Sequence, residues 1–253
     1  MLGWLFEPKL PVSPEEREWV DSSLDWLLET FGEERFQQVT VVLPTPEFFP
    51  QEWDGTPACA RIALKQVCRY MRVDPERIEL RFFEEGLPAE VRRALPLWEE
   101  RTSGAAGLYQ EGRKQKVIIS INREQLREPE SLIATLAHEL GHVLLLADGK
   151  ISPTAADMEP MTDLITVFLG MGIFTANSAI QYRTFTDVQE SGWSISRQGY
   201  LSEELWAYAL ARFTRMQGEP RPGWIKHLTV NVRAYMKESL RYLDRGEDVA
   251  LGE

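Results

Sequence analysis

The sequence predicts an α+β protein, with a small mixed or antiparallel sheet in its first half and a mainly helical second half. Short runs rich in β-branched and aromatic residues, the composition typical of strands, all lie before residue 122. From residue 129 onward, apolar residues recur at helical spacing. We therefore expect an α/β part over residues 1–125 and a helical part over residues 126–253, joined in one compact unit.

The N-terminal part begins with an irregular, proline-rich stretch. Ser13 is expected to cap a helix that begins at Pro14, because Ser is a preferred N-cap residue and acidic residues follow it in the first turn. Gly32 should end that helix. Residues 39–43 are mostly β-branched and predict a strand, which Pro44 closes.

Further along, we expect a helix over residues 56–72 and a strand over residues 77–83. In the second of these segments polar and apolar residues alternate, as in a half-buried strand. Residues 106–110 and 117–121 have the pattern of a β-hairpin around a short polar turn. Residues 84–104 show no pattern that assigns them to an element.

The C-terminal part is expected to consist of helices. One begins at Pro129, and Ser202 should cap another over residues 203–217. A last amphipathic helix is expected over residues 224–245. The apolar run 164–176 is shorter than the roughly 20 residues that cross a bilayer, so we interpret it as a buried helix and expect no membrane-spanning segment.

Composition narrows the class of protein. The formal net charge of −11 argues against nucleic-acid binding, which needs clustered Lys and Arg. The first eight residues lack the basic and apolar regions of a signal peptide. Cys59 and Cys68 are nine residues apart in one expected helix, hence on opposite faces, and cannot pair. Free thiols favour a reducing, cytoplasmic location.

One motif indicates chemistry: His138-Glu139-Leu140-Gly141-His142, an H-E-x-x-H pattern inside an apolar helical run. The two His are four residues apart, so both imidazoles lie on one helical face and can bind a single zinc ion. Glu139 is rotated by about 100° from them and can act as general base toward a water held by the metal. The chain has three His in total, so a chance match is improbable. Gly141, unfavourable in mid-helix, suggests that another segment passes close by.

A catalytic zinc usually takes three protein ligands and keeps one position for water. Glu159 and Asp163 are also four residues apart, at the start of the next apolar run. One carboxylate can bind the metal, while the other accepts a hydrogen bond from the free ring nitrogen of a ligand His. Pro160 places Glu159 at the start of its helix. Either acid could be the third ligand, and we favour Glu159.

These two patterns together resemble those of the gluzincin-type zinc metallopeptidases, in which H-E-x-x-H is followed by a Glu on the next helix, often with an Asp one turn later. The resemblance is strict over residues 138–163. It implies a zincin-like fold, one Zn²⁺ held by His138, His142 and Glu159, and Asp163 orienting a ligand His. It also makes residues 107–110 a candidate strand at the lip of a substrate cleft.

The function expected from these observations is hydrolysis of peptide bonds in a peptide or protein substrate, with Glu139 as general base. The alternative is a catalytically silent, metalloprotease-like protein that uses the same cleft to bind a partner. A peptidase also needs a donor that stabilises the oxyanion of the transition state. The sequence offers Tyr182, Arg183, Tyr200 and His227 without choosing among them.

Overall fold

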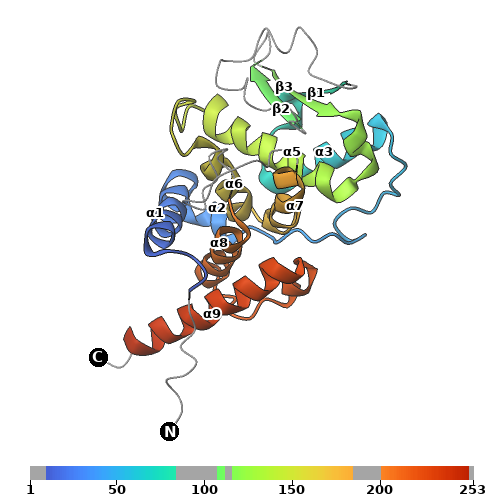
Figure 1. The fold of residues 1–253 in the computed structure, drawn as a ribbon. Coiled ribbons are helices and arrows are strands. Elements are labelled where there is room, and N and C mark those ends of the chain that lie inside the picture. Colours follow the sequence, from blue (N-terminus) through green and yellow to red (C-terminus); the bar gives the residue numbers. More distant parts are fainter. Residues whose placement is uncertain (1–9, 84–106, 112–115, 185–200, 251–253) are drawn as a thin grey trace.

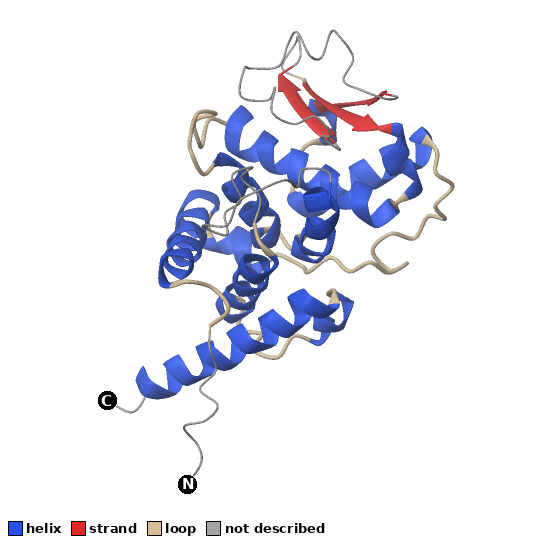
Figure 2. Cartoon of the chain, in the orientation of Figure 1, coloured by secondary structure: helices blue, strands red, loops and turns tan. Residues whose placement is uncertain are grey.

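The structure is a computed structural model that describes residues 10–83, 107–111, 116–184 and 201–250. The described chain is mostly helical, with a small sheet at one end (Figures 1 and 2). Its elements, in order, are α1 (Pro14–Phe31), α2 (Glu33–Gln37), α3 (Pro57–Met71), η2 (Pro75–Arg77), β1 (Ile78–Phe83), β2 (Gly107–Glu111), β3 (Val117–Asn122), η4 (Arg123–Arg127), α5 (Pro129–His142), η5 (Val143–Ala147), α6 (Met158–Phe168), α7 (Gly172–Thr184), α8 (Glu203–Met216), η6 (Gly223–His227) and α9 (Val230–Ala250).

The sheet has the strand order β1-β3-β2. β1 pairs with β3 in parallel, with Ile78 opposite Val117. β2 pairs with β3 in the antiparallel direction, with Gly107 opposite Ile121. In β3, residues 117–121 are all buried, as expected for a central strand covered on both faces. Figure 1 shows the sheet next to α5 and α3.

α5 is the central helix of the molecule, packing against α3, α6, α7 and β2. Pro129 stands at its start, where the missing N–H needs no partner. Ten of its 14 residues are buried, so little of this helix faces solvent. Together with η5 it is the one helix in the described ranges that is long and apolar enough to cross a membrane, and 72% of that window is buried inside the molecule.

Three helix starts agree with the local signals in the sequence. Ser13 caps α1 and forms a capping box with Glu16, in which each side chain accepts a backbone N–H of the other residue. Thr56 caps α3, and Ser202 caps α8 by accepting the backbone N–H of Leu205. The predicted caps Ser13 and Ser202 are confirmed, because a cap depends on residues only a few positions apart.

The strand predicted over residues 39–43 is wrong. This segment is irregular, and its Val42 N–H donates to the carbonyl oxygen of Gly170 at 2.9 Å. Gly170 has φ +83°, and a Cβ built there would lie 2.3 Å from Thr40 O. Residues 39–43 therefore pack against the turn between α6 and α7. The hydrogen bond from Val42 N–H to Gly170 O takes the place of the regular hydrogen bonds of a strand.

Two helix boundaries also differ from the prediction. The apolar run 164–176 is divided between α6 and α7, because the backbone of Gly170 is in the left-handed region and ends α6. The last helix, predicted from residue 224, begins at Val230, after the short helix η6. The Asn177 side chain binds His227 O and Thr229 N, each at 2.9 Å, and holds the chain in a turn there.

The buried apolar side chains form a cluster that draws on both the N-terminal and the C-terminal part. Phe36, from α2, stacks on Phe168 of α6 with ring centroids 4.9 Å apart. Phe49 meets Phe174 of α7 edge-on at 5.6 Å. Cys59 and Cys68 are both free and buried. The N-terminal residues are thus part of the core against which the helices of the candidate site pack.

Candidate metal centre

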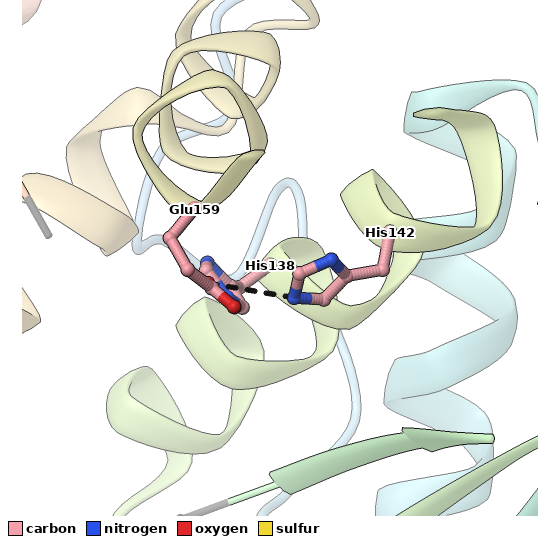
Figure 3. A group of neighbouring side chains, drawn as sticks. All are labelled: His138, His142 and Glu159. Carbon is pink, nitrogen blue, oxygen red and sulfur yellow. Dashed lines mark hydrogen bonds and ion pairs between the residues drawn. The ribbon is translucent and has the colours of Figure 1, made fainter. Parts of the chain in front are cut away.

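α5 and α6 bring together the three side chains with the best geometry for a metal ion. His138 and His142 lie one turn apart on α5, and Glu159 lies in the first turn of α6. Glu159 Oε2 is 3.1 Å from His138 Nε2 and 3.6 Å from His142 Nε2. Figure 3 shows the two rings and the carboxylate directed toward one another.

These distances suit a zinc site. Ligands about 2.0–2.1 Å from a tetrahedral zinc are themselves roughly 3.3 Å apart. The two distances from Glu159 Oε2 to the ring nitrogens bracket that value, and one ligand atom from each of the three residues lies within 4.8 Å of the others. Both histidines direct Nε2 toward Glu159, so each ring, when deprotonated there, would offer the same atom to a metal.

The geometry also separates the roles of the two acids. Asp163 Oδ1 lies 2.9 Å from Nδ1 of His138, on the side of the ring away from Glu159. Asp163 Oδ2 accepts the backbone N–H of Leu201 at 3.1 Å. Both oxygens of Asp163 are therefore engaged, whereas Glu159 faces both Nε2 atoms. Glu159 has the position of a third ligand, and Asp163 that of the acid that orients His138.

Thr162, which the sequence analysis missed, holds the other ring. Its Oγ1 lies 3.3 Å from Nδ1 of His142, and the residue is fully buried. A hydroxyl between Glu159 and Asp163 in an otherwise apolar helix was the available signal, but spacing alone does not tell whether it faces the core or the site. Each histidine thus has a polar partner from α6 at Nδ1.

The close contact between α5 and α6 depends on Gly141. A Cβ at this position would lie 3.0 Å from Thr162 Cγ2, 3.0 Å from Thr162 O and 3.1 Å from Ile165 Cγ2. The expectation that another segment passes close to Gly141 is confirmed. Because Gly141 lies directly before His142, the absence of a side chain there lets the residues of α6 reach the rings.

The following pKa values apply to the cluster in the absence of a metal ion. Burial lowers the pKa of His142 to about 4, so that ring is neutral at pH 7. Burial also disfavours the charged form of His138, but its hydrogen bonds to Asp163 and Glu159 outweigh this and raise its pKa well above the usual value. Burial would raise the pKa of Glu159, but the two histidines lower it to about 2.

Asp163 and His138 are joined by a hydrogen bond, and burial raises the pKa of the Asp163 carboxyl as well. The two raised pKa values mean that the pair retains one proton around neutral pH. That proton belongs on the ring, since Asp163 accepts two N–H hydrogen bonds that favour its ionised form. Metal-free His138 is therefore an imidazolium between two carboxylates, a place where a divalent cation can replace the proton.

Glu139 lies on α5 next to His138 and is 5% exposed. The cluster itself is partly open, since the side chain of Glu159 is 24% exposed while those of His138 and His142 are 11% and 8% exposed. A small solute can therefore approach from the Glu159 side. The arrangement combines a potential cation site, a route for solvent and a neighbouring buried carboxylate.

Of the expected oxyanion donors, His227 is the one whose side chain lies in the described part of the chain. Tyr182 and Arg183 lie in the last turns of α7, but their side chains are outside the described part of the chain, as is all of Tyr200. His227 lies in η6, not in a long helix as predicted, and its carbonyl oxygen binds Asn177. It is not one of the residues grouped around the candidate metal position.

Comparison of the chain with known protein families, with curated protein sequences and with solved structures found no match.

Proposed function

We propose that this protein is a zinc-dependent peptidase, with Zn²⁺ held by His138, His142 and Glu159. The observation that carries the proposal is that two packed helices bring three possible ligand atoms together. Glu159 Oε2 lies 3.1 Å from Nε2 of His138 and 3.6 Å from Nε2 of His142. Asp163 and Thr162 at the opposite ring nitrogens add support, because ligand histidines usually donate their second N–H to a polar partner.

In the proposed reaction Zn²⁺, when bound, acidifies a water molecule and polarises the substrate carbonyl. Glu139 accepts a proton from the attacking water and later gives it to the amine that leaves, so the carboxylate ends the cycle unchanged. Its place beside His138 in the H-E-x-x-H motif supports this role. His138 and His142 serve as neutral ligands in this scheme, with Asp163 holding the ring of His138.

A peptide substrate also agrees with the position of β2. This strand pairs with β3 and lies at an edge of the described sheet, next to α5. An edge strand presents main-chain donors and acceptors that can bind an extended peptide of any sequence. We propose that β2 holds the substrate close to the metal, in a zincin-like arrangement. The negative charge of the chain and its free thiols agree with a cytoplasmic protein that acts on peptides and not on nucleic acids.

The second candidate function is a catalytically silent protein that binds a partner through the same cleft. The low exposure of the two ligand rings favours this alternative, because a partner can bind at the surface of the cluster without its main chain reaching the metal, whereas cleavage requires that it does. Glu139 favours the enzyme, because a protein that only binds has no chemical need for a base beside the metal.

The test measures metal and activity together. Purified protein should contain one equivalent of zinc and cleave members of a peptide library. Glu139→Gln should keep the zinc but lose about 10²–10⁴-fold of the cleavage rate, the usual contribution of a general base. His142→Ala should lose the zinc as well, which separates the role of a ligand from that of the base.

Two results would contradict the proposal in different ways. Protein that takes up no zinc, even when zinc is supplied in excess, would exclude the metal site. Stoichiometric zinc without cleavage, together with capture of a peptide by the wild type and not by His142→Ala, would establish the binding protein in place of the enzyme.

A further inference from the structure

Thr162 is the feature of the cluster that motif spacing does not explain. It is fully buried on α6, between the two acids, and its Oγ1 has two close N or O neighbours besides a weaker contact with Met158 Sδ at 3.9 Å. One is the carbonyl oxygen of Met158, one turn earlier in the same helix, at 2.9 Å. The other is Nδ1 of His142, at 3.3 Å. The directions of these two hydrogen bonds determine what Thr162 does to the ring.

A threonine hydroxyl has a single proton to donate. The carbonyl oxygen of Met158 can only accept and is the nearer of the two partners, and Thr162 Oγ1 donates to it at 2.9 Å. Toward His142, Oγ1 can then act only as an acceptor, and Nδ1 of the ring must carry the hydrogen. In a neutral imidazole the proton resides on one nitrogen, so Nε2 of His142 carries a lone pair. Nε2 lies 3.6 Å from Glu159 Oε2, so a cation can bind between the two atoms. Without a metal the Glu159 carboxylate favours a proton on Nε2, and the contact with Thr162 has to outweigh that preference.

We propose that Thr162 is a positioning residue that fixes His142 in the Nδ1–H form, so that its Nε2 is ready to bind a divalent metal ion. The proposal rests on the proposed metal site and deepens it by assigning the group that prepares the second histidine. Asp163 has the corresponding position at Nδ1 of His138, with a carboxylate in place of a hydroxyl.

Gly141 makes this contact possible. The Cγ2 and main-chain oxygen of Thr162 each lie 3.0 Å from the place where a Cβ of Gly141 would be. A side chain at 141 would therefore push Thr162 away from the ring that follows in the sequence. The hydrogen bond between Thr162 and His142 therefore depends on the close contact of α5 and α6 at Gly141.

The first test reads the ring directly and needs no metal. In uniformly ¹⁵N-labelled, metal-free protein at pH 8, two-bond ¹⁵N–¹H correlation spectra distinguish a protonated ring nitrogen from one with a lone pair. We expect a protonated Nδ1 and an unprotonated Nε2 for His142, with signals assigned by their loss in His142→Ala. A His142 protonated at Nε2 in the wild type would overturn the proposal.

The second test measures the dissociation constant of Zn²⁺ by competition with a chelator. Thr162→Val keeps the shape of the side chain but removes the acceptor, and should weaken zinc binding by about 10–100-fold, as is usual for the loss of such a partner. Thr162→Ser restores the hydroxyl and should bind zinc almost as the wild type does. Thr214→Val is the matched control, because Thr214 is a fully buried threonine on α8 whose hydroxyl donates to Ala211 O at 2.8 Å.

The outcomes separate this proposal from the proposed function. Zinc affinity unchanged in Thr162→Val would overturn the role of Thr162 and leave the metal site intact. A wild type that binds no zinc would overturn the proposed function, while the spectra of the metal-free protein would still decide the protonation of His142. Equal weakening in Thr162→Val and Thr214→Val would show a general packing effect and would also overturn the proposal.

Discussion

At the scale of single residues, the two histidines differ in charge although they share a motif. His138 lies between two carboxylates and holds a proton, while His142 faces a hydroxyl and is neutral at pH 7. The partners on α6 set this difference, not the motif on α5. A metal ion that binds both rings must therefore displace a proton from one of them only.

This asymmetry predicts that zinc binding at pH 6 releases one proton per ion. His138 must give up its proton to become a ligand, whereas His142, with a pKa of about 4, and Glu159, with a pKa of about 2, are already deprotonated. Zinc affinity should therefore fall by about tenfold for each unit that the pH decreases below neutrality, until His142 titrates. Calorimetry in buffers of different ionisation enthalpy counts the protons.

The number of protons discriminates between the charge states of the pair. No release would mean that His138 is neutral in the metal-free protein. Release of two would mean that Asp163 holds a proton in addition to the ring. His142→Ala serves as control for heat that does not come from the metal site.

The residues of the motif could be identified from sequence, but their partners could not all be. Two His four positions apart share a face on any helix, so His138 and His142 were predictable. Glu159 and Asp163 have the same spacing, and only the rotation of α6 relative to α5 distinguishes a ligand from a neighbour. Thr162 was missed for the same reason.

At the scale of elements, the candidate site depends on how closely α5 and α6 pack. Two of the proposed ligands come from α5 and one from α6, so a shift between the helices changes both distances from Glu159 to the rings. Gly141 sets that separation, since the atoms of α6 lie 3.0–3.1 Å from the place of its missing Cβ.

Gly141→Ala is therefore expected to destabilise the metal-free protein by about 1–3 kcal/mol, the usual effect of overpacking a core. The gain in helix propensity, roughly 1 kcal/mol, offsets part of this. The same change should weaken zinc binding, because it moves Thr162 and Glu159 away from the rings. Urea unfolding and a zinc titration measure the two effects.

Gly223→Ala is the control for adding a methyl group. No atom lies within 4 Å of a Cβ built at Gly223, and it begins the short helix η6, outside the metal cluster. If Gly141→Ala were as stable as Gly223→Ala and bound zinc normally, the helices would not depend on this contact.

Helix ends were predictable where the signal is local. Ser13 and Ser202 each accept a backbone N–H from three residues further on, and both helices start where expected. The start of α9 was predicted six residues too early, because Asn177, about fifty positions away, binds the turn before it. Apolar periodicity continues through residues 224–229 and conceals that turn.

At the scale of the whole molecule, residues 36–42 contact the turn between α6 and α7 and its neighbour Phe168, and so attach the N-terminal part to the helices of the site. Val42 donates to Gly170 O, and Thr40 O lies 2.3 Å from the place where a Cβ of Gly170 would be. Phe36 stacks on Phe168, two residues before this turn. Residues 39–43, which were predicted to form a strand, make this contact instead.

Gly170→Ala should therefore destabilise the whole protein strongly, by about 2–5 kcal/mol. A non-glycine residue at positive φ costs about 1–2 kcal/mol, and the contact with the main chain of Thr40 adds an overpacking penalty of about 1–3 kcal/mol. Gly218→Ala has a similar positive φ, +71°, with no atom within 4 Å, and should show only the first contribution. Denaturant unfolding of both variants measures the difference, and equal destabilisation would exclude the close contact.

The predicted α+β class is confirmed in its coarse form, since the described chain is mostly helical and carries a small sheet. The sequence did not reveal that β1 pairs with β3 across more than thirty intervening residues, because no local pattern encodes which strands become neighbours. The zincin-like arrangement and the gluzincin resemblance remain predictions. Both depend on the pattern and arrangement of His138, His142 and Glu159, since no solved structure matched the fold.

The contact at Gly141 also has an evolutionary consequence. One of the three atoms facing this position is a main-chain oxygen, so trimming a side chain elsewhere cannot make room for a methyl group. Descendants of this sequence that keep both histidines should therefore keep glycine here as well. A lineage that acquires any larger residue at this site is expected to have given up the ion before it tolerated the change.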